Sequence, residues 1–157
     1  MPSGERHHAL YVRRGGDKTA LVVHGWRNCS IDFLYLARMY EKELGYNIIV
    51  PDIYGHGQSE GDAVRMGWLD RKDMLEWLRI FKTDTMVVHG VSMGGATTMM
   101  LSGEEMVYAL YKAKTGYKEL WITEGTEHAF SYKDHRDAYV RRVKEFLARA
   151  KSRNGSS

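Results

Sequence analysis

Residues 90–94 (Gly-Val-Ser-Met-Gly) follow the pattern Gly-x-Ser-x-Gly, which suits a nucleophilic serine on a sharp turn. They come after the apolar run 86–88 and before the helical run 96–101. A strand that turns tightly into a helix needs small neighbours here, because larger side chains would collide. The turn exposes the serine hydroxyl, and the helix behind it aims backbone N–H groups at an oxyanion. The pattern therefore predicts Ser92 as a nucleophile.

Two further segments carry residues that could complete this chemistry. Residues 24–26 (His-Gly-Trp) close another apolar run, and the backbone N–H of Trp26 is the predicted second oxyanion donor beside that of Met93. The alternative is a tight turn whose glycine only relieves strain. Of the seven histidines, His128 is the candidate base, because it lies in a glycine-rich loop between the last predicted strand and the last predicted helix.

The segment 52–61 contains a Gly-x-Gly pair after a strand, which is also a feature of dinucleotide-binding loops. Its third glycine comes one residue late, and no strand-ending acid follows at the expected distance. We therefore interpret it as a structured loop beside the site, with His56 as a hydrogen-bonded loop residue. His7 and His8 lie near a predicted edge strand without other ligands at zinc-like spacing, so we predict neither a metal nor a cofactor.

Five apolar, β-branched or aromatic runs predict strands, and helical periodicity fills the gaps between them. The strands are expected at residues 8–13, 19–24, 47–51, 85–89 and 119–123. Four of these runs are continuously apolar, as in strands that are covered on both faces. The alternation predicts a three-layer, doubly wound α/β fold, with helices on both faces of a mostly parallel sheet. All the candidate residues then lie at the carboxyl edge of one sheet, where such folds carry their chemistry.

Length and composition bound the class of protein. The chain of 157 residues is 43% hydrophobic and 27% charged, as in an ordinary globular protein. We predict one domain over residues 1–151 and a flexible tail over 152–157. No apolar run is long enough to span a bilayer, so we expect no membrane as partner. The net charge of +3 is small and the basic residues are scattered, so we expect no nucleic acid as partner. The single cysteine, Cys29, is compatible with a reducing compartment, and a cytoplasmic location is the default expectation.

Four motifs in this order resemble those of the α/β-hydrolase-fold serine hydrolases, and most of all a bacterial branch frequent in Bacteroidales. They are residues 24–26, 52–61, 90–95 and 125–128. The resemblance implies a carboxylesterase-like enzyme that acts on small-molecule esters. It makes Ser92 the nucleophile and His128 the base. It also assigns the oxyanion hole to the backbone N–H groups of Trp26 and Met93.

The chain departs from this family between the serine helix and the last predicted strand. Family members carry two further strands, a lid and a Gly-x-x-Asp turn that supplies the acid of the triad. Here residues 101–104 run directly into residues 105–110, so we interpret the chain as a truncated α/β hydrolase with an internal deletion, engineered or natural. Loss of the acid predicts weak activity on small activated esters, unless Glu124, Glu127 or Asp134 replaces it. The alternative is a catalytically silent scaffold.

The deletion also changes the expected sheet. Residues 119–123 should pair in parallel with residues 85–89, in the strand order first, third, second, fourth, fifth, with the first strand antiparallel. The outer edge of that last strand would be apolar at Leu120, Trp121 and Ile122. An unpaired apolar edge invites pairing with another chain, so we expect a homodimer or concentration-dependent association.

Overall fold

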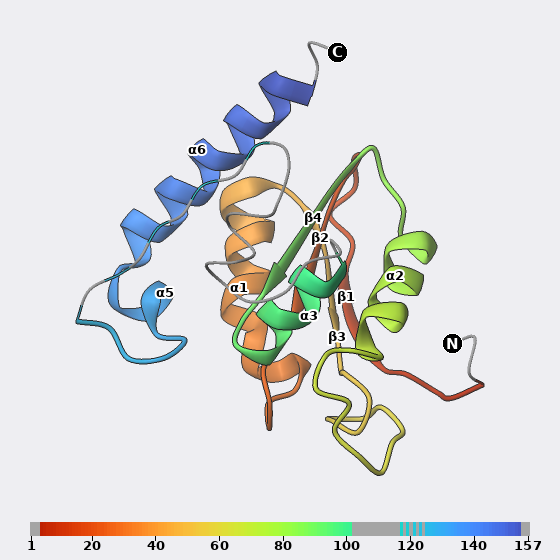
Figure 1. Cartoon of the computed structure of the whole chain (residues 1–157). Coiled ribbons are helices and arrows are strands. Elements are labelled where there is room, and N and C mark those ends of the chain that lie inside the picture. The colour runs from red at the N-terminus through yellow and green to blue at the C-terminus, as the bar shows by residue number, and fades with distance from the viewer. Residues whose placement is uncertain are drawn as a thin grey trace. The chain divides into compact units, whose positions relative to one another are not determined.

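The computed structural model describes residues 4–101, 117, 119, 121, 123 and 125–154. The chain divides into two compact units, Met1–Met106 and Val107–Ser157. The N-terminal unit contains the sheet, and helices make up most of the described part of the C-terminal unit (Figure 1). Among the described residues, no helix is both long and apolar enough to cross a membrane.

Strands and helices alternate in the N-terminal unit. The strands are β1 (Ala9–Val12), β2 (Lys18–Val23), β3 (Asn47–Pro51) and β4 (Thr85–Gly90). The helical segments are η1 (Ser30–Phe33), α1 (Leu34–Arg38), η2 (Met39–Leu44), α2 (Asp70–Ile80) and α3 (Met93–Leu101). The first three helical segments follow one another without a break. They end at Gly45, whose φ of 71° allows the left-handed turn that stops the helix.

The strand order in the sheet is β1-β3-β2-β4. β2 is parallel to both β3 and β4, whereas β1 is antiparallel to β3. The prediction is therefore confirmed for the order of the first four strands and for the reversed first strand. The preference for right-handed crossovers between parallel strands accounts for this order.

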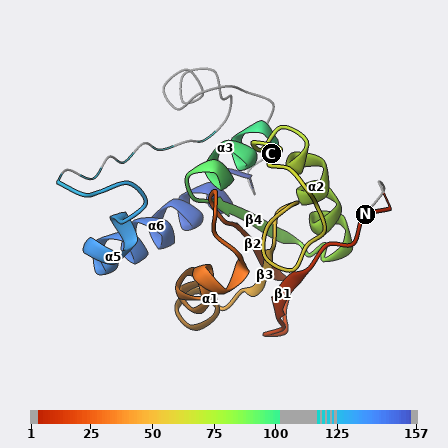
Figure 2. The same cartoon turned by 90° about the horizontal axis from the view of Figure 1, so that it is seen from below.

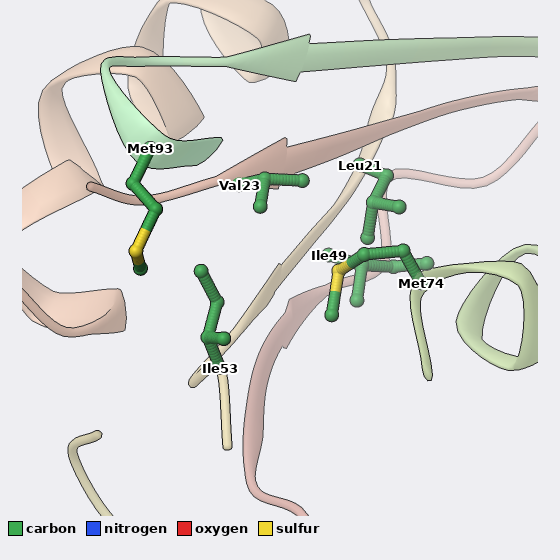
Figure 3. Close-up of a cluster of buried hydrophobic side chains, with 6 residues drawn as sticks. All are labelled: Leu21, Val23, Ile49, Ile53, Met74 and Met93. Atoms are coloured by element: carbon green, nitrogen blue, oxygen red, sulfur yellow. The ribbon is translucent and has the colours of Figure 1, made fainter. Parts of the chain in front are cut away.

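Helices cover both faces of the sheet in the N-terminal unit. The view from below shows α1 on one face and α2 and α3 on the other (Figure 2). Alternate residues of a strand point to opposite faces, so Leu21 and Val23 of β2 share one face. There they pack with Met74 of α2 and Met93 of α3 (Figure 3). This burial on two sides explains why the apolar residues are consecutive in the later part of β2 (20–23) and in β3 (48–51).

The described helices of the C-terminal unit are α5 (Ser131–Asp134) and α6 (Arg136–Asn154). The predicted fifth strand precedes them, but none of its described positions lies in a strand. Two of its described side chains contact α6, with the ring of Trp121 5.9 Å from that of Tyr139 and Oε1 of Glu119 2.8 Å from Nε of Arg149. The mostly parallel five-stranded sheet is therefore corrected to a mixed sheet of four strands in the described part of the chain.

The association expected through the edge of that strand stays a prediction. Leu120 and Ile122, which would form the apolar edge, lie outside the described residues. In the described sheet the last strand is β4, whose residues are only partly buried, unlike those of β3.

α6 continues through Asn154, so residues 152–154 of the predicted tail are helical.

Met74 should contribute far more to stability than its neighbour Leu75, since Met74 is 0% exposed and Leu75 is 39% exposed. Met74→Ala leaves a cavity beside Ile53 and Met93, so we expect the free energy of unfolding to fall by about 2–5 kcal/mol. Leu75→Ala is the matched control and should cost about 0.5 kcal/mol or less. Urea denaturation followed by circular dichroism measures both variants. Equal losses in the two would contradict this assignment of the core.

Candidate active site

Ser92 lies on the turn between β4 and α3. Its φ of 55° is in the left-handed region, which is unfavourable for a residue other than glycine. The residue is exposed, and its carbonyl oxygen accepts the N–H of Ala96 at 3.1 Å as the helix begins. The strained backbone thus holds Ser92 at the tip of a tight turn from strand to helix.

Close backbone packing requires the glycines on either side of this turn. A Cβ on Gly90 would collide with the carbonyl oxygen of Gly94. A Cβ on Gly94 would collide with the carbonyl oxygens of Val23 and His24. The start of α3 therefore lies directly against the end of β2, and a larger residue at either position would push the turn away from that strand.

The loop after β2 also reaches Ser92. A Cβ built on Gly25 would lie 3.2 Å from the Cβ of Ser92 and 3.3 Å from the carbonyl oxygen of Val91. Trp26, the next residue, is 57% exposed. Met93 is the first residue of α3, and its side chain is buried in the core beneath the turn (Figure 3). The structure thus brings the loop that carries Trp26 against Ser92.

Asp52, which follows β3, links three segments around this turn. Its Oδ1 accepts the N–H of Ser30 at 2.6 Å, and its Oδ2 accepts the N–H of Gln58 at 3.0 Å. Oδ2 also lies 2.7 Å from Nδ1 of His8. Burial by itself would raise the pKa of Asp52, but its hydrogen-bond donors lower that pKa below the ordinary value. The ionised carboxylate therefore ties the loops after β2 and β3 to the segment before β1.

His24 joins the carboxyl ends of β2 and β3. Its Nε2 accepts the N–H of Ile53 at 2.9 Å, so the proton lies on Nδ1, which donates to the carbonyl oxygen of Gly25 at 2.8 Å. Burial lowers the pKa of His24, which favours this neutral form. Both ring nitrogens are engaged with the backbone, so His24 positions the loop and is no candidate for the base.

His128, the predicted base, is exposed and lies in the C-terminal unit, in the turn before α5. Its pairing with Ser92 therefore stays a prediction. Glu127 and Asp134 are both exposed, and Glu124 lies outside the described residues. The replacement of the triad acid by one of these three carboxylates likewise stays a prediction.

Some residues hold the loops around Ser92 in place, and a polar residue at the end of a buried strand is the sequence feature that could have identified them. His56 is a hydrogen-bonded loop residue, as predicted, with Nδ1 3.0 Å from the carbonyl oxygen of Tyr54. The roles of Asp52 and His24 were missed, although each directly follows an apolar run. Among the residues that the structure describes, no group of three or more His, Cys, Asp or Glu side chains could hold a metal ion.

A second buried carboxylate, Asp70, has a different environment. Its Oδ2 accepts the N–H of Gly67 at 2.8 Å, whereas its Oδ1 has no hydrogen-bond partner among the described residues. Burial raises the pKa of Asp70 above the ordinary value. A Cβ on Gly67 would lie 3.3 Å from the backbone nitrogen of Thr97, so Asp70 holds this loop against α3.

Removing the charge should have opposite effects at the two carboxylates. The lowered pKa of Asp52 stabilises the fold above its ordinary pKa, and this contribution is lost as the pH falls through the lowered value. Asp52→Asn should therefore cost about 2–3 kcal/mol at neutral pH and less in acid. The raised pKa of Asp70 makes its ionised form unfavourable, so Asp70→Asn should leave stability at neutral pH unchanged or higher. Urea unfolding at neutral pH and at about pH 3, below the ordinary pKa of an aspartate, measures both, and equal losses at neutral pH would contradict these environments.

No family model matches the chain. Over 95 residues it is 32% identical to a carboxylesterase of Bacillus subtilis (strain 168), a match that covers 58% of this chain and 38% of the relative. It is 21% identical over 216 residues to the uncharacterized protein YqkD of the same organism, covering 82% of this chain and 70% of that protein. The second alignment is longer than the 157 residues of this chain, so it includes positions of the relative that have no counterpart here.

Among solved structures, the esterase Pf2001 of Pyrococcus furiosus is similar with a TM-score of 0.59 and 25% identity. This match covers 64% of the chain and 44% of the esterase. The chain thus spans less than half the length of this esterase and of the Bacillus carboxylesterase. The strand order and the serine turn agree with these likenesses. The chain is an α/β-hydrolase-fold protein.

Proposed function

We propose that the chain is a carboxylesterase-like serine hydrolase that acts on small-molecule esters. The observation that carries the proposal is the backbone of Ser92, which is left-handed at the tip of the turn. A Cβ built on Gly25 would lie only 3.2 Å from the Cβ of Ser92, so the loop that carries the proposed donor Trp26 packs against the proposed nucleophile. Likeness to proteins named carboxylesterase and esterase supports the same class of reaction.

In this proposal the Oγ of Ser92 attacks the carbonyl carbon of the ester while His128 accepts the hydroxyl proton. The backbone N–H groups of Trp26 and Met93 stabilise the negative charge on the tetrahedral oxygen. The C–O bond to the alcohol breaks, and the alcohol leaves with the proton from His128. Water then attacks the acyl-serine with His128 again as base, which releases the acid and restores the hydroxyl.

The proposal includes an internal deletion that removed the lid, two strands and the triad acid. The alignment with YqkD supports this deletion, because it extends over 216 residues whereas the chain has 157. Without its acid a triad histidine loses orientation and stabilisation of its cation, which costs about 10⁴-fold in kcat in other enzymes. Oxyanion stabilisation does not depend on that acid, so slow turnover of small activated esters is expected. An engineered and a natural deletion have the same chemical consequence.

Labelling with a fluorophosphonate probe tests the nucleophile without requiring turnover. We expect one adduct per chain, located on Ser92 by peptide mass spectrometry, because this residue is exposed at the tip of a strained turn. Ser92→Ala should remove the adduct. If Ser92 stays unlabelled in protein that circular dichroism shows to be folded, the hydrolase proposal fails and the silent scaffold is the better description.

Hydrolysis of 4-nitrophenyl acetate tests the base. We expect slow turnover that Ser92→Ala abolishes and that His128→Ala lowers by at most about 100-fold, because the orienting acid is absent. His135→Ala is the matched control, since His135 is in the same unit and its Nε2 pairs with Thr126 at 2.9 Å. Equal losses in the two histidine variants would remove His128 from the mechanism.

A further inference from the structure

The backbone of Arg27 has a conformation that is unfavourable for arginine. Its φ is 61°, in the left-handed region that suits glycine and asparagine. Ser92 shares this kind of strain. Such residues persist where the surrounding structure holds them, and they concentrate at functional sites.

The loop that contains Arg27 is held on both sides of it. On one side, Gly25 lies against Ser92 as described above, and its carbonyl oxygen accepts the N–H of Asn28 at 3.3 Å. On the other side, the N–H of Ser30 is bound by Asp52 at 2.6 Å. Arg27 is two residues from Gly25, a span of about 7 Å at most. Its side chain is therefore within reach of a molecule bound at Ser92.

The guanidinium of Arg27 is exposed and packs over the ring of Trp26, 5.3 Å from its centroid. In the part of the chain that the structure describes, it forms no ion pair. Asp32 is the acid nearest in this segment, and its carboxylate accepts the N–H of Cys29 at 2.9 Å and the side-chain amide of Asn28 at 3.3 Å. A cation on an aromatic face thus lies in the loop that packs against Ser92.

We infer that Arg27 and Trp26 form a subsite for a carboxylate group of the substrate, so that esters with a carboxylate near the scissile carbonyl are preferred. This inference rests on the proposed hydrolase function and narrows its substrate class. A guanidinium binds a carboxylate through two parallel hydrogen bonds, and a single guanidinium matches a monoanion. The indole ring offers an apolar face to the carbon chain between the two carbonyl groups.

The subsite can be tested by the binding of two amides, because a weak esterase does not hydrolyse amides. Succinamate carries one carboxylate, and succinamide is its neutral analogue of the same size. The indole N–H resonance of Trp26 reports binding in an NMR titration. The chain has four tryptophans, and the resonance that is lost in Trp26→Phe identifies that of Trp26. We expect succinamate to bind about two- to fivefold more tightly than succinamide. Added salt should shrink this difference.

Two variants separate the charge of Arg27 from the shape of its loop. Arg27→Asn removes the charge, and asparagine tolerates the left-handed backbone, so we expect the preference to vanish without a loss of thermal stability. Arg71→Gln is the control, because the guanidinium of Arg71 in the first turn of α2 also packs over an indole ring, 3.8 Å from the ring centroid of Trp68. It should keep the full preference for succinamate. Equal binding of both amides, or a preference that survives Arg27→Asn, would overturn the inference.

Failure of the carboxylate subsite and failure of the proposed hydrolase function give different experimental outcomes. A preference for succinamate without labelling of Ser92 would leave a carboxylate subsite on a chain that is no hydrolase. Labelling of Ser92 without that preference would refute the subsite and leave the proposed hydrolase intact.

Discussion

Burying a carboxylate is costly unless hydrogen bonds replace its water, and Asp52 is only 1% exposed. Its donors come from parts of the chain that are far apart in sequence, namely His8, Ser30 and Gln58. Ser59 adds a further link, since its hydroxyl accepts the N–H of His8 and donates to the carbonyl oxygen of Asp52. The buried charge of Asp52 therefore helps to hold the loop that approaches Ser92. Loss of that charge would release several segments together.

Two carboxylates in the same unit show how local donors decide the effect of burial. Both Asp52 and Asp70 are almost fully buried. Backbone N–H groups reach both oxygens of Asp52, whereas one oxygen of Asp70 has no partner in the described part of the chain. Hydrogen bonds to the ionised form favour it, and desolvation disfavours it, so the two pKa values move in opposite directions. Burial alone predicts neither the charge state nor the contribution to stability.

Backbone crowding is the second constraint at the candidate site. The end of β2 passes so close to α3 that Gly94 has no room for a side chain, and the next loop brings Gly25 against Ser92. The proposed nucleophile and both proposed oxyanion donors thus belong to the N-terminal unit, whereas His128 belongs to the other unit. In the proposed mechanism, stabilisation of the oxyanion would depend on the packing of one sheet, and proton transfer would depend on a residue of the other unit.

The order of the first four strands and the turn that carries Ser92 could be predicted from the sequence. Continuously apolar runs such as β3 require cover on both faces, and the Gly-x-Ser-x-Gly pattern meets a local steric demand of the chain. Local pattern and local sterics are properties of neighbouring residues, and the right-handed preference of crossovers then limits the strand order, so the sequence determined these features by itself. The tertiary structure decided the rest. Residues 119–123 have the composition of a strand, but their described side chains contact α6, and Asp52 acquires its role only when three distant segments supply donors. The energies of such contacts depend on which parts of the chain meet in space, and no single segment of sequence contains that information.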